Sequence, residues 1–340
     1  MATGAGYSGK EWTCGIGIAD IDAGSSAGAI GATTQVANVE SMNLFRVSTL
    51  NDIAWSGGYN AAEIERTGTR SMTSEDYMNH YGSGNWTWDF DYDVDNEIVI
   101  QALLQMIYPE NGATTTSLVI PAKPTYTTYA HGDNTGNNRN AVILLRNPLA
   151  SKDRILHSAI LQNLTLTQDA GTNGGLLKAT GQFMSGYKPT ITTDSTSVTE
   201  GDANFKKTIF QNTTHTLGGN EASFKSWSIT IDNPASRVGY QGTSWEADGY
   251  VRSNPIKVTG SVVVKADSTV QGYLESKWQA NDVFAFAMNN GTTGFDISLP
   301  NCLMTNFSMD MADDGIFATL DFVATTGVDY GTAVATIKMT

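Results

Sequence analysis

The chain has 340 residues, of which 34 are Asp or Glu and 20 are Lys or Arg, so its formal net charge is −14. This balance argues against a protein that grips nucleic acid, because phosphate binding needs clustered basic side chains. Charged residues make up 16% of the chain and Gly contributes 34 residues, a mixture that favours short strands joined by turns and disfavours an all-helical fold.

The length exceeds what one small core fills, and about 100–200 residues per domain suggests two domains. No stretch approaches the roughly 20 apolar residues of a membrane-spanning helix. The first residues, MATGAGYSGKEW, lack the basic start and the apolar run of a signal peptide. We therefore expect a soluble protein that is not exported.

The first segments of the chain predict an arm, a strand and a loop. Residues 1–37 are rich in Gly, Ala and Ser and predict an N-terminal arm that orders on assembly. Residues 43–52, NLFRVSTLND, predict a strand, and a Gly- and polar-rich loop follows over residues 53–71. This loop holds an aromatic pair, Trp55 and Tyr59.

Residues 86–95 alternate between apolar and polar side chains, which predicts a strand with one buried face. The polar face of this strand carries Asp89, Asp91 and Asp93. Asp95 or Asn96 then offers a helix N-cap, and the apolar spacing up to residue 108 becomes that of a short amphipathic helix. The pattern predicts a strand followed by a helix that lies against a sheet.

Three further segments complete the first half. Residues 108–153 contain a polar run and predict an inserted hairpin with a polar tip. Residues 160–186 alternate on both sides of a Gly-rich turn and predict a β-hairpin. Residues 188–205 are rich in Thr, Ser and Asp and predict a linker.

The second half repeats the first. Residues 256–278 match residues 86–108 without a gap, and both copies read as a strand followed by a helix, with Asp267 or Ser268 as the second N-cap. The flanking segments match as well: residues 223–232 correspond to 43–52, and residues 303–327 to 160–186. The predicted organisation is an arm (1–37), a first domain (38–187, with the inserted hairpin at about 108–153), a linker (188–205) and a second domain (206–340).

The second copy has the most recognisable order of elements. It runs SWSITIDNPASRVGYQGTSWEADGYVRSNPIKVTGSVVVKADSTVQGYLESKW and then ISLPNCLMTNFSMDMADDGIFATLDFVATTG, so a Gly-rich loop leads into a VTGS-type strand, a helix and a final hairpin. This order resembles that of the major tail tube proteins of long-tailed, siphovirus-like bacteriophages. The resemblance covers residues 223–327 well and, through the repeat, residues 43–186 more faintly.

The resemblance implies a fold and a function. Proteins of that family form a β-sandwich with a flanking helix, neighbouring sheets join into a β-barrel around a lumen, and rings stack into a tube. Most members have one such domain and form hexameric rings, so two tandem copies suggest a homotrimeric, pseudo-hexameric ring. The protein is then a structural, non-enzymatic component of the virion tail, made in the host cytoplasm and needing no cofactor. Its partners are copies of itself, the tape measure protein, and the tail terminator and distal tail proteins, while dsDNA passes through the lumen during ejection and no membrane is involved.

The polar faces of the repeated strands are candidates for the lumen, where acids would repel DNA phosphates. The candidate lumen residues are Asp89, Asp91, Asp93, Thr259 and Ser261. A solvated outer face is the alternative, and Lys257 and Lys265 in the second copy weaken the lumen interpretation.

The long loops before the repeated strands, residues 53–71 and 233–254, are candidates for contacts between stacked rings. Each holds an aromatic pair of the kind that anchors interfaces: Trp55 with Tyr59, and Tyr240 with Trp245. The alternative is that these rings pack over their own sandwich.

Other chemistry is weakly indicated. The string DFDYDVDNE invites a calcium interpretation, but a strand aims alternate carboxylates in a row and does not wrap them around one ion. No catalytic or metal-binding motif stands out, and Cys14 and Cys302 are expected to be reduced core thiols. The competing functional hypothesis is a two-domain β-sandwich adhesin or carbohydrate-binding surface module, which would be a monomer with an exposed aromatic platform.

Overall fold

The computed structural model confirms the prediction of a mainly β fold, with a large antiparallel sheet and two short α-helices. The structure describes residues 9–21, 42–56, 59–63, 77–81, 84–107, 117–120, 138–147, 152–193, 198–199, 207–238, 246–247, 249–252, 254–291, 294–312, 315–326 and 333–339.

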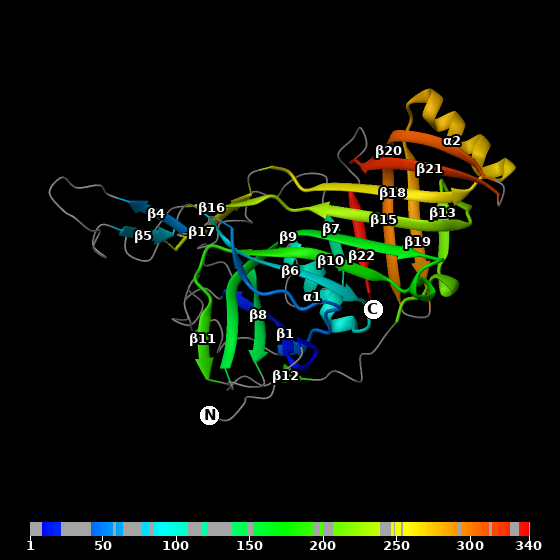
Figure 1. The fold of residues 1–340 in the computed structure, drawn as a ribbon. Helices are drawn as coiled ribbons and strands as arrows, with labels where there is room; N and C mark the ends of the chain where they lie inside the picture. Colours follow the sequence, from blue (N-terminus) through cyan, green and yellow to red (C-terminus); the bar gives the residue numbers. More distant parts are fainter. Residues whose placement is uncertain are drawn as a thin grey trace.

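The elements follow one another in two runs, as labelled in Figure 1. The first run is η1 (Gly9–Glu11), β1 (Thr13–Ile21), β2 (Met42–Leu44), β3 (Ala54–Trp55), β4 (Tyr59–Glu63), β5 (Tyr77–Tyr81), β6 (Trp86–Asp93), α1 (Glu97–Ile107), β7 (Ser117–Ile120), β8 (Asn138–Asn147), β9 (Lys152–Asp169), η3 (Asn173–Gly175), β10 (Lys178–Ser185), β11 (Thr190–Thr193) and β12 (Val198–Thr199). The second run is η5 (Phe210–Asn212), β13 (Thr214–Leu217), β14 (Asn220–Glu221), β15 (Phe224–Asp232), β16 (Ala235–Val238), β17 (Gly249–Arg252), β18 (Lys257–Lys265), α2 (Ser268–Ala280), β19 (Phe284–Asn290), β20 (Phe295–Ala312), β21 (Gly315–Ala324) and β22 (Ala335–Lys338).

One continuous sheet, here called the long sheet, runs through both halves of the chain in the order β6–β10–β9–β15–β18–β21–β20. Every neighbouring pair in this order is antiparallel. The two predicted hairpins, β9–β10 and β20–β21, are confirmed. Strands of the first and the second half lie side by side in Figure 1, where β9 runs next to β15. The halves are therefore joined by a backbone ladder within the chain.

The strands β9 and β20 are each 18 residues long and change partners half-way along. The first part of β9 pairs with β8 and β11, and its second part pairs with β10 and β15. In β9 the change of partner occurs at Ser158, which has a φ of 50°. The register of the β8–β9 pairing shifts at the same place, between Ala141 and Ile143 of β8. The hydroxyl of Tyr250 donates a hydrogen bond of 2.8 Å to the carbonyl of Ser158, which fixes the bend.

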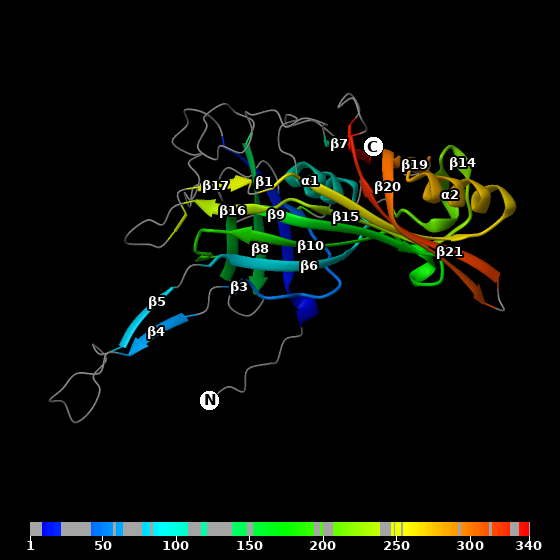
Figure 2. The same cartoon turned by 90° about the horizontal axis from the view of Figure 1, so that it is seen from above.

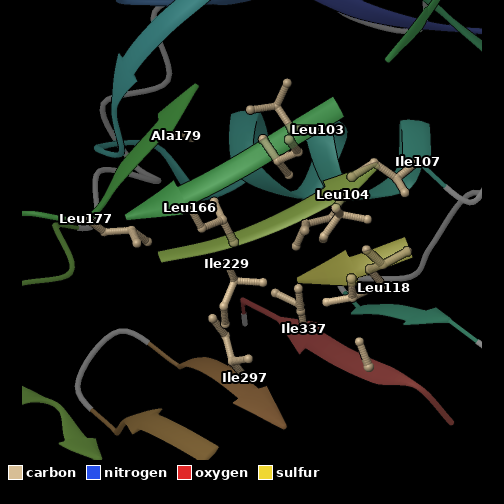
Figure 3. Close-up of a cluster of buried hydrophobic side chains, with 14 of the residues drawn as sticks. Leu103, Leu104, Ile107, Leu118, Leu166, Leu177, Ala179, Ile229, Ile297 and Ile337 are labelled. Atoms are coloured by element: carbon tan, nitrogen blue, oxygen red, sulfur yellow. The ribbon is translucent and has the colours of Figure 1, made fainter. Parts of the chain in front are cut away.

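A single large hydrophobic core extends across both halves. Figure 3 shows its centre, where Leu103, Leu104 and Ile107 of α1 lie near Leu166 of β9 and Ile229 of β15. Strand β22 closes the other side of this centre because it pairs with both β20 and β7. Helix α1 is consequently buried, whereas α2 buries only Val270 and Leu274.

The predicted N-caps are present in both helices. The Asn96 side chain accepts a hydrogen bond of 2.9 Å from the backbone N–H of Ile98 at the start of α1. The Asp267 carboxylate accepts from the N–H groups of Thr269 and Val270 at the start of α2. Side-chain capping therefore marks the strand-to-helix transition in each half.

Each half of the long sheet contains one cross-strand pair of Gly and Phe. Phe90 in β6 lies opposite Gly181 in β10, and Gly260 in β18 lies opposite Phe322 in β21. A Cβ atom at Gly260 would lie 2.3 Å from Phe322 Cζ, and one at Gly181 would lie 2.9 Å from Phe90 Cζ. In each half the Phe ring therefore covers the glycine of the neighbouring strand. The Phe is on β6, the strand before α1, in the first half, but on β21 rather than on β18, the strand before α2, in the second half.

The segment predicted as an N-terminal arm, residues 1–37, contributes a core strand, and this corrects the prediction for its described part. Strand β1 pairs with β8 over nine residue pairs, from Thr13 with Arg146 to Ile21 with Asn138. Cys14 and Ile16 are buried in the core. The Gly- and Ala-rich composition hid a strand whose pairing partner lies more than 100 residues away.

Two further segment predictions are corrected in their described parts. The stretch 108–153 does not form a hairpin of its own, because β7 pairs with β22 while β8 pairs with β1 and β9. The predicted linker, residues 188–205, supplies β11, which pairs with β9, and β12, which pairs in parallel with β2. Thr- and Ser-rich polar segments pair with sheet strands here, a role that composition alone does not distinguish from a linker.

Candidate assembly surfaces

The long sheet has one face in the core and one polar face. Along β6 the side chains of Trp88, Phe90 and Tyr92 are buried, while Asp89 and Asp91 point to the other side. The same alternation holds in the other long-sheet strands. The polar face carries the five predicted lumen candidates Asp89, Asp91, Asp93, Thr259 and Ser261, so the structure brings them together on one surface.

Cross-strand polar contacts order this face. The Lys178 ammonium lies 2.8 Å from the Asp91 carboxylate, and the Gln182 side chain donates a 2.7 Å hydrogen bond to Asp89. At the junction of the two halves the hydroxyls of Thr165 and Thr230 lie 2.9 Å apart. The charged residues of the face are mainly acidic: Asp89, Asp91, Asp93, Asp169, Asp232, Asp310 and Asp321 are accompanied by Lys178, Lys225, Lys257 and Lys265.

Two shallow hollows lie on the polar face. One has a volume of about 350 Å³ beside the end of the β9–β10 hairpin and is bordered by Asp93, Asp169 and Lys178. The other, of about 410 Å³, lies over β18 and β21 next to Thr259 and Asp321. Both are open troughs with polar rims, and the surface is corrugated rather than smooth.

The β4–β5 hairpin extends away from the body of the molecule, as Figures 1 and 2 both show. Trp55, predicted to contact a stacked ring, lies at the base of this hairpin, where its ring is 5.2 Å from that of Trp86 and β3 pairs with β6. The backbone of Tyr59 belongs to β4, opposite Tyr81. Trp55 therefore packs on Trp86 of its own sheet, and its role in ring stacking stays a prediction.

The second long loop is anchored to the body of its own chain. Ala235, Ala247 and Tyr250 pack with Ile160 and Met184 in a small buried cluster. Burial raises the pKa of Tyr250 to about 12, so its hydroxyl stays protonated and holds the bend of β9. Tyr240 and Trp245 lie outside the described residues, and their stacking role stays a prediction.

The long sheet has an open edge at β20, a feature that the sequence reasoning missed. At one end, residues 303–312 of β20 pair with β21, and among the described residues no strand lies along their other edge. At the opposite end, residues 45–52 are held to β6 by the Val47–Tyr92 bridge and by a hydrogen bond of 2.6 Å from Ser48 N to Asp91 O. Ser48 and Thr49 form a bend, and the N–H of Phe45 donates a hydrogen bond of 2.8 Å to the carbonyl of Cys14 in β1. The strand predicted over residues 43–52 is therefore confirmed only at its start, where β2 ends at Leu44.

Exposed apolar side chains gather at the β20 end. The large apolar residues most exposed in the described part of the chain are Ile191, Trp278, Met311 and Ile316. Met311 is 76% exposed and lies opposite Ile316 at the tip of the β20–β21 hairpin. Trp278 of α2 has its ring 6.3 Å from that of Phe307, so it flanks the same strand. The exposure of Trp278 and Met311 follows from the missing neighbour strand, which hydrophobic spacing cannot reveal.

The cysteines and histidines have structural surroundings. Cys14 and Cys302 are buried free thiols, as predicted, and burial raises the pKa of Cys302 to about 12. His215 lies between Phe210 and Phe224 with ring centroids 4.6 Å from each, and burial lowers its pKa to about 4. A thiol and an imidazole in these states are neutral at pH 7.

The fold and surfaces define a mainly β protein with one large antiparallel sheet, a polar sheet face and, among the described residues, an open strand edge at β20. No helix in the described ranges is long and apolar enough to cross a membrane. No protein-family model matches the chain, and no curated protein matches it either.

Proposed function

We propose that the chain is a structural subunit of a bacteriophage tail tube, built from two tandem tail-tube domains of one fold. The observation that carries the proposal is the long sheet, in which a first and a second set of strands are joined edge to edge with a common polar face. A sheet that already continues across two similar units within one chain can continue across chains in the same way. Closure of such a sheet into a barrel removes its open edges.

The pairing order of the strands supports two copies of one domain. In the first half, β9 pairs with β8, β10 and β11. In the second half, β20 pairs with β19, β21 and β22 in the corresponding order. Strand β6 pairs with β10 as β18 pairs with β21. In the sequence β6 is followed by α1 and β18 by α2, and each of these helices has a side-chain N-cap.

The register of the pairing agrees with the sequence repeat. In the first half, Val47 bridges Tyr92, and Tyr92 lies opposite Ala179. In the second half, Trp227 lies opposite Val262, and Val262 opposite Leu320. The gap-free match of residues 86–108 with 256–278 places residue 92 on 262, and the separate match of residues 43–52 with 223–232 places residue 47 on 227. The Val47–Tyr92 bridge and the Trp227–Val262 pair therefore join equivalent residues.

In this proposal three chains close a pseudo-hexameric ring, rings stack into a tube, and the polar face of the long sheet lines the lumen. The acids on this face would repel DNA phosphates, and Thr and Ser would keep the wall hydrated, so dsDNA could pass without sticking. The partners would be further copies of the chain, the tape measure protein, and the tail terminator and distal tail proteins. The protein would need no cofactor and perform no catalysis.

The test is self-assembly of the purified protein over a range of concentrations, followed by negative-stain electron microscopy and sedimentation velocity. Rings or hollow tubes whose population grows with concentration would support the proposal. A persistent monomer, even with the native tail partners added, would contradict it and would favour a monomeric adhesin or carbohydrate-binding module.

A further inference from the structure

We propose that Tyr250 and the bend of β9 form an acid-sensitive latch, which holds β17 against the first half of the chain at neutral pH and releases it when His157 is protonated. Strands β16 and β17 belong to the second half, yet they lie beside β9 in Figure 2. All the contacts of this latch lie within one chain, so the inference is independent of the proposed function.

The Tyr250 hydroxyl is the centre of the latch. It accepts a hydrogen bond of 2.7 Å from the backbone N–H of Gly186, after β10, and donates one of 2.8 Å to the carbonyl of Ser158 in β9. Beside it, the N–H of Ala247 donates a 3.0 Å hydrogen bond to the carbonyl of Gly186. A Cβ atom at Gly186 would lie only 2.5 Å from that of Ala247, so the two backbones pack closely. One side chain thus ties β17 to two segments of the first half.

The latch holds a strained residue in place. Ser158 has a φ of 50°, a conformation that residues with a Cβ adopt only at an energetic cost. Its carbonyl is the group that Tyr250 binds, so the latch helps to offset this cost. Residues in such conformations cluster at switch regions, because release of the holding contact lets the backbone relax.

His157 places a titratable ring next to the strained residue. The side chain is buried, with Nδ1 3.4 Å from the Ser158 hydroxyl oxygen, a backbone hydrogen bond to Lys188 and the Tyr187 ring 6.1 Å away. The carbonyl of His157 accepts a 2.8 Å hydrogen bond from Ser185. The ring therefore sits among the residues that Tyr250 joins.

The surroundings of the His157 ring offer no counter-charge. Among the described residues, the titratable or charged groups around it are Tyr187, Lys188, Tyr250 and Arg237, and further along the same face of β9 the Arg146–Asp153 pair. The Asp153 carboxylate is already bound by Arg146 through hydrogen bonds of 2.8 and 3.0 Å. In this part of the chain no carboxylate contacts the ring, so an imidazolium would be buried without a partner.

This arrangement sets the direction of the pH response. Burial lowers the pKa of His157 from its ordinary value of 6.5, so the open state, in which the ring meets water, binds the proton more tightly. The latch should be equally stable at all pH values above 6.5. Below 6.5 the ratio of open to closed latch should rise by up to tenfold per pH unit, until the pH reaches the lowered pKa.

The experiment is hydrogen–deuterium exchange of the full-length protein between pH 7.5 and 5, read by mass spectrometry and corrected for the intrinsic pH dependence of exchange. The reporters are the amides of Gly186, Tyr187 and Ala247, whose bonds depend on the latch. We expect their protection to fall by about tenfold between pH 6.5 and 5.5. At every pH they should exchange faster than the amides of β18, because the opening is local.

Three variants assign the response. His157→Gln should remove the pH dependence at the reporters, whereas His215→Phe, which removes the other buried histidine, should preserve it. Tyr250→Phe should raise exchange at Gly186 about tenfold or more even at pH 7.5, because the buried N–H loses its acceptor. Wild-type reporters that show no pH dependence, that exchange only as slowly as β18, or that lose their response in His215→Phe would overturn the latch. So would an unchanged response in His157→Gln.

Discussion

The substitution Gly260→Ala tests how the repeated sheet is packed. The new Cβ would lie 2.3 Å from Phe322 Cζ and 2.7 Å from Cε2, distances at which something must shift. Phe322 is buried beneath neighbouring core residues, so its ring cannot swing away freely. Overpacking of this kind costs about 1–3 kcal/mol, and we expect the free energy of unfolding to fall by that amount.

The matched control is Gly272→Ala in α2, where a Cβ would meet nothing within 4 Å. Alanine is the better helix former, so this variant should gain up to about 1 kcal/mol. Urea denaturation followed by tryptophan fluorescence compares the two midpoints.

A double-mutant cycle isolates the Gly–Phe contact. In a Phe322→Leu background the ring is absent, and the Gly260→Ala cost should shrink by about 0.5–3 kcal/mol. Equal costs in both backgrounds, or stabilisation by Gly260→Ala itself, would refute the packing explanation.

Three further outcomes are expected. Burial lowers the pKa of His215 to about 4 from its ordinary 6.5, so the unfolded state binds the proton more tightly. The contribution of His215 to stability should be constant above pH 6.5 and fall by about 1.4 kcal/mol per pH unit between 6.5 and 4. Burial also lowers the pKa of His157, so the slope of the wild-type protein in urea titrations should be reduced but not abolished by His215→Phe. Asp267→Ala should cost about 1 kcal/mol in the same assay, because it removes the α2 N-cap acceptor. Met311→Lys should weaken self-association, measured by sedimentation velocity, because Met311 lies at the open edge of β20. The control is Ile191→Lys, since Ile191 is also exposed but lies on β11, and it should leave self-association unchanged. An identical response of the two variants would contradict the assignment of the β20 edge as an assembly surface.

Local patterns predicted the repeated strand–helix units and both hairpins. The alternation of apolar and polar residues around Phe90 and Val262 predicted which face of each strand is buried, and Asp267 predicted the start of α2. These features could be predicted because they depend on residues only a few positions apart in the sequence. The polar face also followed from alternation, since Asp89, Asp91 and Asp93 had to lie opposite the core residues of the same strand.

Features set by distant partners could not be predicted in the same way. Strand β1 has a Gly-rich sequence and becomes a strand through its pairing with β8, and β11 becomes one through β9. The continuity of the sheet from β9 to β15 depends on one long-range ladder that no local motif encodes. The open edge of β20 is a property of strand order, so only the assembled sheet reveals it.

The most direct test of the central claim is cryo-electron microscopy of the assemblies formed by the wild-type chain. The proposal predicts stacked rings of three chains with sixfold pseudo-symmetry, a hollow centre, and the polar face carrying Asp91 and Thr259 turned toward that centre. Rings of another chain number would contradict the pseudo-hexameric closure. A solid filament, or a lumen lined by any other surface, would contradict the assignment of this protein as a tube subunit with a polar inner wall.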